Sequence, residues 1–289
     1  MRLRLGTRGS ALALAQARWV AERLAGEVEL VELTTAGDVQ RDVGDKSRWT
    51  GALERALVAG EIDVAVHSAK DVPGELAPGT RIAAVPPRED ARDVLVGAPS
   101  LDALPGGARV GTSALRRRAQ LLAVRPDLDV VELRGNVDTR LRKLAEGEVA
   151  ALVLAAAGLA RLGRRDVVAA PLEGDLFVPA PGQGALIVQA RAGDARVAAA
   201  VDGRVDDAVS RAALAAERDV AARLGASCHT AIGVRAGAGS LAAFAGLPDG
   251  SEWLIDEVAR GDGDAGDLAE RLLAAGAADL LARAEAMTA

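Results

Sequence analysis

The sequence predicts an α/β protein with two lobes, each a largely parallel sheet covered by helices, followed by a smaller C-terminal α+β domain. Short β-rich runs alternate with longer helical patterns through the first two thirds of the 289 residues, which is typical of α/β units. Half of the residues are hydrophobic and only 2% are aromatic, so we expect a core of small aliphatic side chains. After Asp206 the pattern changes to a long helix, glycine-punctuated strands and a final helix.

Apolar, β-branched runs bounded by turn residues indicate the strands. The first lies at residues 2–6 and precedes an amphipathic helix with Leu12 and Trp19 on one face. In chain order, the remaining strands of the lobes are expected at residues 28–34, 63–67, 81–85, 94–97, 109–111, 130–134, 151–155 and 185–190. The C-terminal domain adds a helix through Gly225 and strands at residues 232–236, 240–247 and 253–259.

Composition excludes several classes of protein. The net charge of −6 argues against a general nucleic-acid binder, because phosphate contacts need a basic face. The lone cysteine, Cys228, excludes an internal disulfide and fits a reducing compartment, and two histidines make a structural zinc site improbable. The longest apolar run, residues 149–160, is shorter than the ~20 residues of a membrane span. We therefore expect a cytoplasmic protein without a membrane or nucleic-acid partner.

Two similar turns come after the first strands of the two lobes. LGTRGSAL begins at Leu5 and VGTSAL at Val110, about a hundred residues later, and each leads from a strand into a helix. Duplication and convergence both explain this similarity. Free N–H groups at a helix start attract anions, and Arg8 adds a full charge to the first turn. A tight turn with Ser10 as the helix N-cap explains the same residues without a ligand.

Arginines gather near the second turn. Three of them fall in the first turns of a helix, where a cation opposes the helix dipole by ~0.3–1 kcal/mol. Positive charges in such an unfavourable position indicate a binding site for a polyanionic small molecule at the strand ends. Exposure to solvent would explain one or two of these arginines without a ligand. The arginines are Arg116, Arg117, Arg118, Arg134 and Arg140.

Two further segments carry candidate reactive groups. Lys70 and Asp71 leave an apolar strand in VHSAKDVP, and an aspartate beside a lysine can move protons or stabilise positive charge. Hydrogen bonding of Asp71 to its own turn is the alternative. Cys228 lies in the loop GASCHT beside His229, where a covalent role and a small buried hydrophobe are both open.

Eight motifs in order resemble the hydroxymethylbilane synthase family, also called porphobilinogen deaminases. They cover most of the chain, and their joint order is specific where any one alone is weak. The motifs are LGTRGSALALAQA, VHSAKDVP, PREDARDVLV, VGTSALRRRAQL, ELRGNVDTRLRKL, LAAAGLARLG, PAPGQGAL and ERDVAARLGASCHTAIG.

The resemblance implies two lobes similar to periplasmic binding proteins around a cleft, with a third domain that anchors a covalent dipyrromethane cofactor. We expect the first lobe at residues 1–90 with 184–204, the second at 91–183 and the third at 205–289. The implied activity is a monomeric transferase that joins four porphobilinogen units head to tail, releases ammonia and yields the linear tetrapyrrole hydroxymethylbilane.

The resemblance also implies roles for residues that match the family's motifs. Cys228 is the thioether anchor of the cofactor, and Asp71 is the catalytic carboxylate. The implied cofactor-binding residues are Lys70, Asp71, Thr112, Ser113, Arg116, Arg117 and Cys228. The implied substrate-binding residues are Arg8, Ser10, Arg134, Arg140 and Arg161.

Two segments depart from the family's pattern. Ala114 stands where the family often has serine after GTS, which removes one hydroxyl contact. Residues 45–52 replace a Gly-Lys-Gly-x-Phe-x-Lys-Glu lid loop, with Trp49 in place of its aromatic residue. We assign no catalytic role to His229.

Two other functions are compatible with parts of the sequence. A two-lobed anion receptor without chemistry explains the paired turns and the arginines, but it leaves Asp71 and Cys228 without a task. A cysteine-dependent hydrolase explains Cys228 beside His229 and predicts a free, alkylatable thiol.

Overall fold

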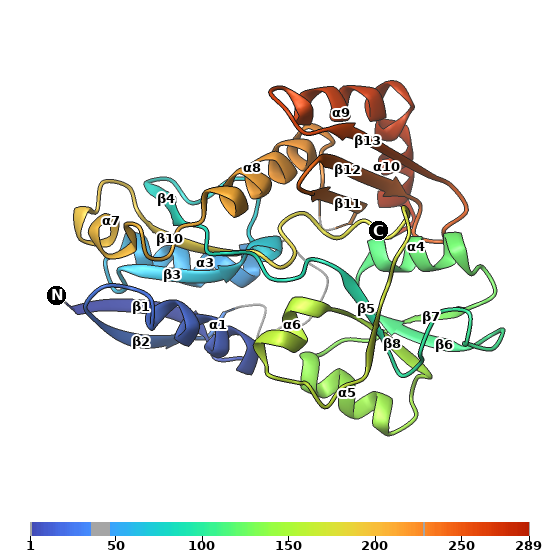
Figure 1. The fold of residues 1–289 in the computed structure, drawn as a ribbon, viewed down its shortest axis with the longest axis horizontal. Coiled ribbons are helices and arrows are strands. Elements are labelled where there is room, and N and C mark those ends of the chain that lie inside the picture. Colours follow the sequence, from blue (N-terminus) through green and yellow to red (C-terminus); the bar gives the residue numbers. More distant parts are fainter. Residues whose placement is uncertain (1, 36–46, 228, 289) are drawn as a thin grey trace. The chain divides into compact units, whose positions relative to one another are not determined.

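The computed structural model describes residues 2–35, 47–227 and 229–288, and it shows the predicted mixed α/β architecture (Figure 1). The chain divides into two compact units. Met1–Glu89 and Gly184–Ala215 form the first unit, and Asp90–Gln183 and Ala216–Ala289 form the second. Two sheet-and-helix lobes and a small three-stranded sheet are present, as the sequence predicts. The exact boundaries of three separate domains stay a prediction.

The first unit holds a five-stranded sheet in the order β2-β1-β3-β10-β4. Strand β1 pairs in parallel with β2 and β3, whereas β10 pairs antiparallel with β3 and β4. Four of the five strands therefore run in one direction, which confirms the largely parallel sheet, and only β10, the strand that returns from the second unit, runs against its neighbours. The strands are β1 (Arg2–Arg8), β2 (Glu27–Leu33), β3 (Val64–Ser68), β4 (Thr80–Ala84) and β10 (Leu186–Arg191).

The second unit repeats this arrangement in a sheet of order β7-β6-β8-β5-β9. Strand β6 pairs in parallel with β7 and β8, and β5 pairs antiparallel with β8 and β9. The two similar sequence turns thus come after topologically equivalent strands, β1 and β6. The strands are β5 (Asp93–Val96), β6 (Arg109–Thr112), β7 (Asp129–Glu132), β8 (Ala151–Ala155) and β9 (Ala169–Pro171), of which the sequence missed only the three-residue β9.

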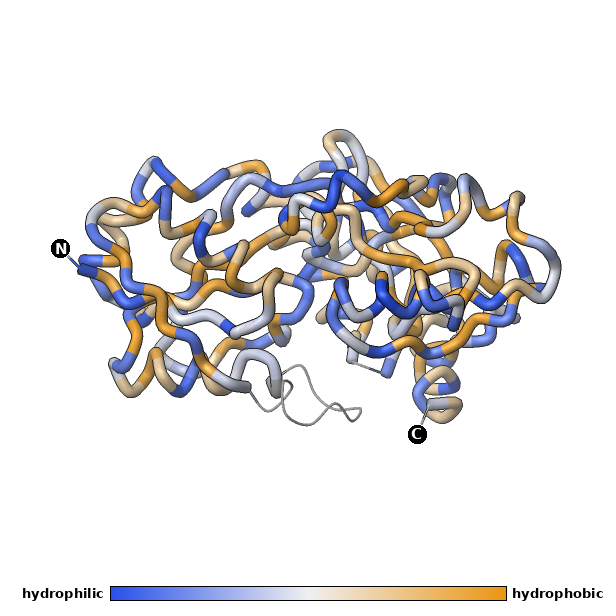
Figure 2. The backbone as a smooth tube through the Cα atoms, turned by 90° about the horizontal axis from the view of Figure 1, so that it is seen from below, coloured by the Kyte–Doolittle hydropathy of each residue, from blue (hydrophilic) through white to orange (hydrophobic). Residues whose placement is uncertain are grey.

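Helices cover both faces of each sheet and close the cores. In the first unit, α1 (Ala11–Ala21) and α7 (Ala195–Val201) pack on one face, and α3 (Ser47–Val58) packs on the other. In the second unit, α4 (Leu115–Val124) covers one face, while α5 (Val137–Ala145) and α6 (Ala156–Arg161) cover the other. Figure 2 shows the resulting alternation of hydrophobic and hydrophilic stretches along the backbone.

The C-terminal segment of the second unit forms an antiparallel sheet, β11-β12-β13. One face of this sheet packs against the last two helices, and its other face contacts α4. Its elements are the second half of α8 (Ala208–Arg223), whose first half belongs to the first unit, and then β11 (Ala231–Ala236), β12 (Ser240–Gly246), β13 (Trp253–Ala259), α9 (Asp264–Ala274) and α10 (Ala277–Ala286). Among the described helices, none is long and apolar enough to cross a membrane.

The expected single final helix is wrong, because Gly276 divides it into α9 and α10. Its φ of 102° lies in the left-handed region that only glycine adopts without strain. This residue lets the chain turn so that both helices bury apolar side chains against the same sheet.

We predict that Gly276→Ala lowers the free energy of unfolding by about 1–2 kcal/mol, because an L-residue is strained at this φ. Urea denaturation measures the change. The matched control is Gly239→Ala, at a glycine without positive φ whose added Cβ meets nothing within 4 Å. Equal stabilities for the two variants would contradict the conformational explanation.

Candidate functional site

The candidate residues lie just beyond the strands beside the topological switch point of each sheet. In the first unit the chain leaves β1 for β2 on one side, and β3 lies on the other side. Ligands of open α/β sheets bind outside the carboxyl ends of such strands. Arg8 and Ser10 are at the end of β1, and Lys70 and Asp71 come after β3, so the topology gathers these four at one sheet edge.

The second unit has the same geometry at β6 and β8. Thr112 ends β6 and Ser113 comes next, while Arg161 ends the helix after β8. The sequence therefore placed its candidates correctly with respect to strand ends in both units. Their binding roles remain predictions.

The first turn combines a capped helix with a stacked cation. The Ser10 hydroxyl accepts a hydrogen bond from Ala13 N (3.3 Å), so Ser10 is the N-cap of α1. The Arg8 guanidinium lies over the Trp49 ring, with Cζ 4.1 Å from the ring centroid. This cation–π contact fixes Arg8 beside the first turn of α3. Of the predicted lid segment, Asp45 and Lys46 lie outside the described residues.

Asp71 is a half-buried carboxylate in the single 3₁₀ turn Ala69–Asp71. Ala69 N donates to Ala185 O (3.0 Å), which pins the start of this turn to the strand segment beside it. Within residues 2–35, 47–227 and 229–288, no hydrogen bond or ion pair engages the Asp71 carboxylate. Asp71 therefore does not serve to hydrogen-bond its own turn, and its charge is available to a ligand.

The second unit contains a buried ion cluster built on Asp93. Arg116 Nη1 lies 2.7 Å from Asp93 Oδ2, and Arg117 Nη2 lies 2.7 Å from Oδ1. All three side chains are at most 7% exposed, and the two guanidiniums hold the pKa of the Asp93 carboxyl far below its usual range despite burial. Gln183 Nε2 also donates to Asp93 Oδ1 (2.8 Å). One carboxylate thus partly compensates two arginines that would otherwise oppose the α4 dipole unpaired.

Sequence reasoning missed Asp93 and Gln183, although both lie in motifs that carry the family resemblance. The sequence does not show that both side chains are buried. The motif around Asp93 is rich in charged residues and reads as a solvated loop, whereas the structure places the carboxylate in the core.

Arg140 lacks compensation of this kind. Its Nη2 donates to Ser113 Oγ (2.7 Å), but its buried Nε has no hydrogen-bond partner, and in the described ranges no carboxylate pairs with it. Burial, together with the positive charge of Arg117, lowers the pKa of Arg140 to about 10. A half-buried cation without a counterion is typical of an anion-binding site.

The remaining candidates have simpler surroundings. Arg134 pairs with Glu132 (2.7 Å), and Arg161 is half-buried at the end of α6. Thr112 Oγ1 accepts from Ala114 N (3.2 Å), so the hydroxyl of Thr112 engages the backbone where Ala114 offers no capping side chain. Lys70 is half-buried beside Asp71.

Cys228, the predicted cofactor anchor, lies outside the described residues. Its neighbours form a tight turn in which Ser227 N donates to Thr230 Oγ1 (2.9 Å) and His229 N donates to Ser227 Oγ (3.1 Å). Ser227 Oγ also donates to Glu285 Oε1 on α10 (2.6 Å). The residues on both sides of Cys228 are therefore held against the C-terminal helix. In the described part of the chain, no group of His, Cys, Asp and Glu could hold a metal ion.

The donor set fits a polycarboxylate cofactor. In the second unit, three guanidiniums face one internal carboxylate, so positive charge remains for a ligand, and the orphaned Arg140 Nε is a free donor. The fold is thus that of a two-lobed α/β protein, whose second unit offers cationic donors to a small polyanion and whose first unit presents a carboxylate that no described side chain pairs.

Comparison with known proteins identifies the family. The family model described as porphobilinogen deaminase, dipyromethane cofactor binding domain, matches residues 3–199. Porphobilinogen deaminases of Roseiflexus castenholzii (44% identity, 97% of this chain, 98% of that one) and Desulforudis audaxviator (46%, 98% and 97%) are similar over nearly the full length. The chain belongs to the porphobilinogen deaminase family, and the matched domain is the one that binds the dipyrromethane cofactor.

Solved structures that match part of this chain include two solute-binding proteins. A periplasmic binding protein of Salmonella typhimurium with high arginine specificity has a TM-score of 0.39 and 12% identity, over 70% of this chain and 92% of that one. A marine metagenome TRAP solute binding protein specific for aromatic acids has a TM-score of 0.42 and 11% identity, over 75% and 79%.

Buried His67 gives a pH prediction. Burial lowers the pKa of His67 to about 4, whereas an unperturbed histidine titrates near 6.5. Between these pH values the unfolded state binds more protons, so acidification should destabilise the fold by up to about 3 kcal/mol through this group. NMR titration of the imidazole checks the shift, and a His67 signal that titrates near pH 6.5 would contradict it.

The Asp93 cluster gives a stability prediction. Asp93→Ala should lower the free energy of unfolding by about 3–5 kcal/mol, because it leaves two buried guanidinium charges unpaired. The control is Asp129→Ala, which breaks an exposed ion pair with Arg109 (3.0 Å) and should cost at most about 1 kcal/mol. Urea denaturation of both variants measures these losses. If the two variants lose a similar free energy of unfolding, the buried cluster does not stabilise the fold as described.

Proposed function

We propose that this chain is a polymerising transferase that joins four porphobilinogen units head to tail, releases ammonia and forms the linear tetrapyrrole hydroxymethylbilane. Family membership supports the activity. The observation that carries the assignment of the site is the uncompensated charge of Arg140 beside Arg117. Each porphobilinogen carries an acetate and a propionate, which are the groups that guanidinium forks bind best.

The residues divide the work between binding and chemistry. Cys228 would hold the dipyrromethane through its sulfur, and the group supplies, when bound, the pyrrole end on which the chain grows. The remaining donors would hold carboxylates of the cofactor and the substrate. They are Arg8, Ser10, Lys70, Thr112, Ser113, Arg116, Arg117, Arg134, Arg140 and Arg161.

Asp71 is the proposed catalytic carboxylate. When porphobilinogen loses ammonia, its ring becomes an electrophilic azafulvene with positive charge, and a carboxylate without an internal partner can stabilise that charge. The same oxygen atoms can move protons at the pyrrole nitrogen and the leaving amine. The half-buried position of Asp71 excludes part of the solvent and so strengthens this electrostatic effect.

We further propose that the chain acts as a monomer in the cytoplasm on this small-molecule substrate. The lone cysteine and the net charge of −6 support a reducing compartment and the absence of a nucleic-acid partner. A two-lobed anion receptor is not favoured, because family membership and the unpaired Asp71 carboxylate both support a transferase.

Intact-mass measurement tests the covalent assignment. The purified protein should exceed its chain mass of 29.5 kDa by the mass of a dipyrromethane, and added porphobilinogen should produce further stepwise increments. Cys228→Ser should abolish the adduct. A bare-chain mass from a sample that consumes porphobilinogen and releases ammonia would contradict the proposal.

Arg140→Leu tests the anion site. The substitution removes an unpartnered charge, so kcat/KM for porphobilinogen should fall about 10- to 100-fold while the melting temperature stays unchanged or rises. Arg142→Leu on the same helix is the matched control, because Arg142 forms an exposed pair with Glu146 (2.6 Å). If both variants have wild-type kinetics, Arg140 does not bind a ligand.

A further inference from the structure

A layer of buried polar side chains lies between α3 and the sheet of the first unit. Gln189 on β10 donates from Nε2 to Glu54 Oε1 on α3 (2.9 Å) and to Thr80 Oγ1 (2.8 Å). His67 on β3 lies two residues after Ala65, which pairs with Gln189 and packs on α3, so His67 faces the same side of the sheet. His67, Glu54 and Gln189 are each less than 9% exposed, and we call these three residues the polar layer.

The polar layer is connected to both ends of the segment that presents Lys70 and Asp71. This segment leaves the sheet directly after β3, where His67 is the penultimate residue, and returns at Thr80, the first residue of β4. On the return side, Glu54 Oε1 accepts from Ala77 N (3.1 Å) and Thr80 Oγ1 donates to Ala77 O (2.7 Å). The return end of the excursion over residues 69–79 is therefore held by side chains of the layer, and its exit follows directly after His67.

The second unit shows what the fold requires at these positions. Gly6 pairs with Ala65 and Gly111 pairs with Leu152, and both glycines belong to the equivalent Gly-Thr turns. Ala65 and Leu152 are therefore equivalent positions, and two residues further along each strand His67 is equivalent to Leu154. Ala65 pairs with Gln189 and Leu152 pairs with Val96, so Gln189 and Val96 are equivalent as well.

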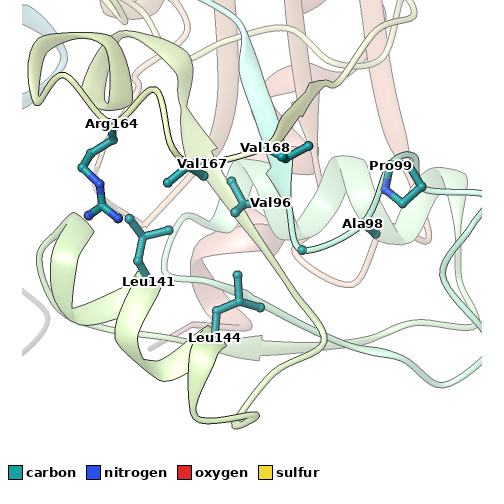
Figure 3. A pocket seen from close by; sticks show the side chains of 9 residues that line it. Val96, Ala98, Pro99, Leu141, Leu144, Arg164, Val167 and Val168 are labelled. Atoms are coloured by element: carbon teal, nitrogen blue, oxygen red, sulfur yellow. The ribbon is translucent and has the colours of Figure 1, made fainter.

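The equivalent positions of the second unit are apolar. Leu154 and Val96 belong to one hydrophobic cluster, into which α5 sends Leu141 and Leu144. Figure 3 shows Val96, Leu141 and Leu144 together around the apolar pocket on this face. This topology thus folds with aliphatic side chains where the first unit has histidine, glutamine and glutamate.

The two units also differ in the residues that come after these strands. The register that equates His67 with Leu154 equates Lys70 with Ala157 and Asp71 with Gly158. The polar layer and the charged pair therefore occur together in one unit and are absent together from the equivalent described positions of the other.

The polar layer stabilises the core less than aliphatic side chains would. His67 Nε2 and Gln189 Oε1 have no hydrogen-bond partner of good geometry, and buried polar atoms without partners destabilise a fold. Features that break a packing rule in one copy of a repeated architecture point to function.

We propose that His67, Gln189 and Glu54 are positioning residues that hold the excursion bearing Lys70 and Asp71 in its reactive conformation. This inference rests on the proposed role of Asp71. The three side chains are not placed against substrate or cofactor. They act by fixing where the 3₁₀ turn leaves β3 and where the chain rejoins β4, and displacement of a catalytic group by about 1 Å can lower a rate about 100-fold.

The test replaces the polar layer by the aliphatic residues of the other unit. The triple variant His67→Leu, Gln189→Val, Glu54→Leu should fold with a melting temperature close to that of the wild type, because the unpartnered atoms of His67 and Gln189 are removed and the Ala77 N–H that loses its acceptor is only half-buried. It should carry the covalent adduct, and its kcat should fall about 10- to 100-fold with KM changed less than about threefold. Glu54→Gln keeps an acceptor for Ala77 and should retain kcat within about twofold.

Thr50→Val is the control for substitution in this core. Thr50 lies one turn before Glu54 on α3, is buried, and has a hydroxyl without a partner, so its kcat should equal that of the wild type. Wild-type kcat in the triple variant would overturn the positioning role. A triple variant that does not fold, with Glu54→Gln as impaired as Glu54→Leu, would also overturn it. Failure of the wild type to consume porphobilinogen would instead refute the proposed function.

Discussion

The attraction between Asp93 and two buried arginines is the interaction on which the second unit's site depends. Arg116 and Arg117 occupy the first turn of α4, where both the helix dipole and burial oppose a positive charge. Their shared carboxylate offsets part of this penalty and orients both guanidinium planes. The compensation is incomplete, and nearby Arg140 has none in the described chain, so the cluster keeps a net positive charge that an anion can neutralise.

The two units show how one architecture supports two tasks. Each unit has three parallel strands side by side, β2-β1-β3 in the first and β7-β6-β8 in the second, and a Gly-Thr turn at the end of the middle strand. In each unit an antiparallel strand lies beside these three. The second unit uses its strand ends for positive charge. The first unit presents Asp71 there, above a polar layer that its counterpart replaces with leucine and valine. The residues that we propose for binding and for chemistry thus occupy equivalent positions of a repeated fold.

The sequence predicts most of this fold because apolar runs between turn residues mark buried strands. Strand direction is less accessible, since β5 and β10 run antiparallel to their neighbours, and each comes directly after the chain passes between the units. Of the site, Asp71 and Arg140 are visible from their motifs. Asp93 is not, because a charged stretch reveals nothing about burial. Nor does a histidine in a strand show that glutamine and glutamate from distant segments will meet it.

Asp71 is available for chemistry because, among the described residues, no hydrogen bond or ion pair engages its carboxylate. Porphobilinogen turnover by Asp71→Ala, measured as ammonia release, tests this most directly. We expect an unchanged melting temperature, because no internal bond is lost, together with a kcat below about 1% of wild type, as expected for loss of a general acid–base group. A folded variant with wild-type turnover would contradict the claim.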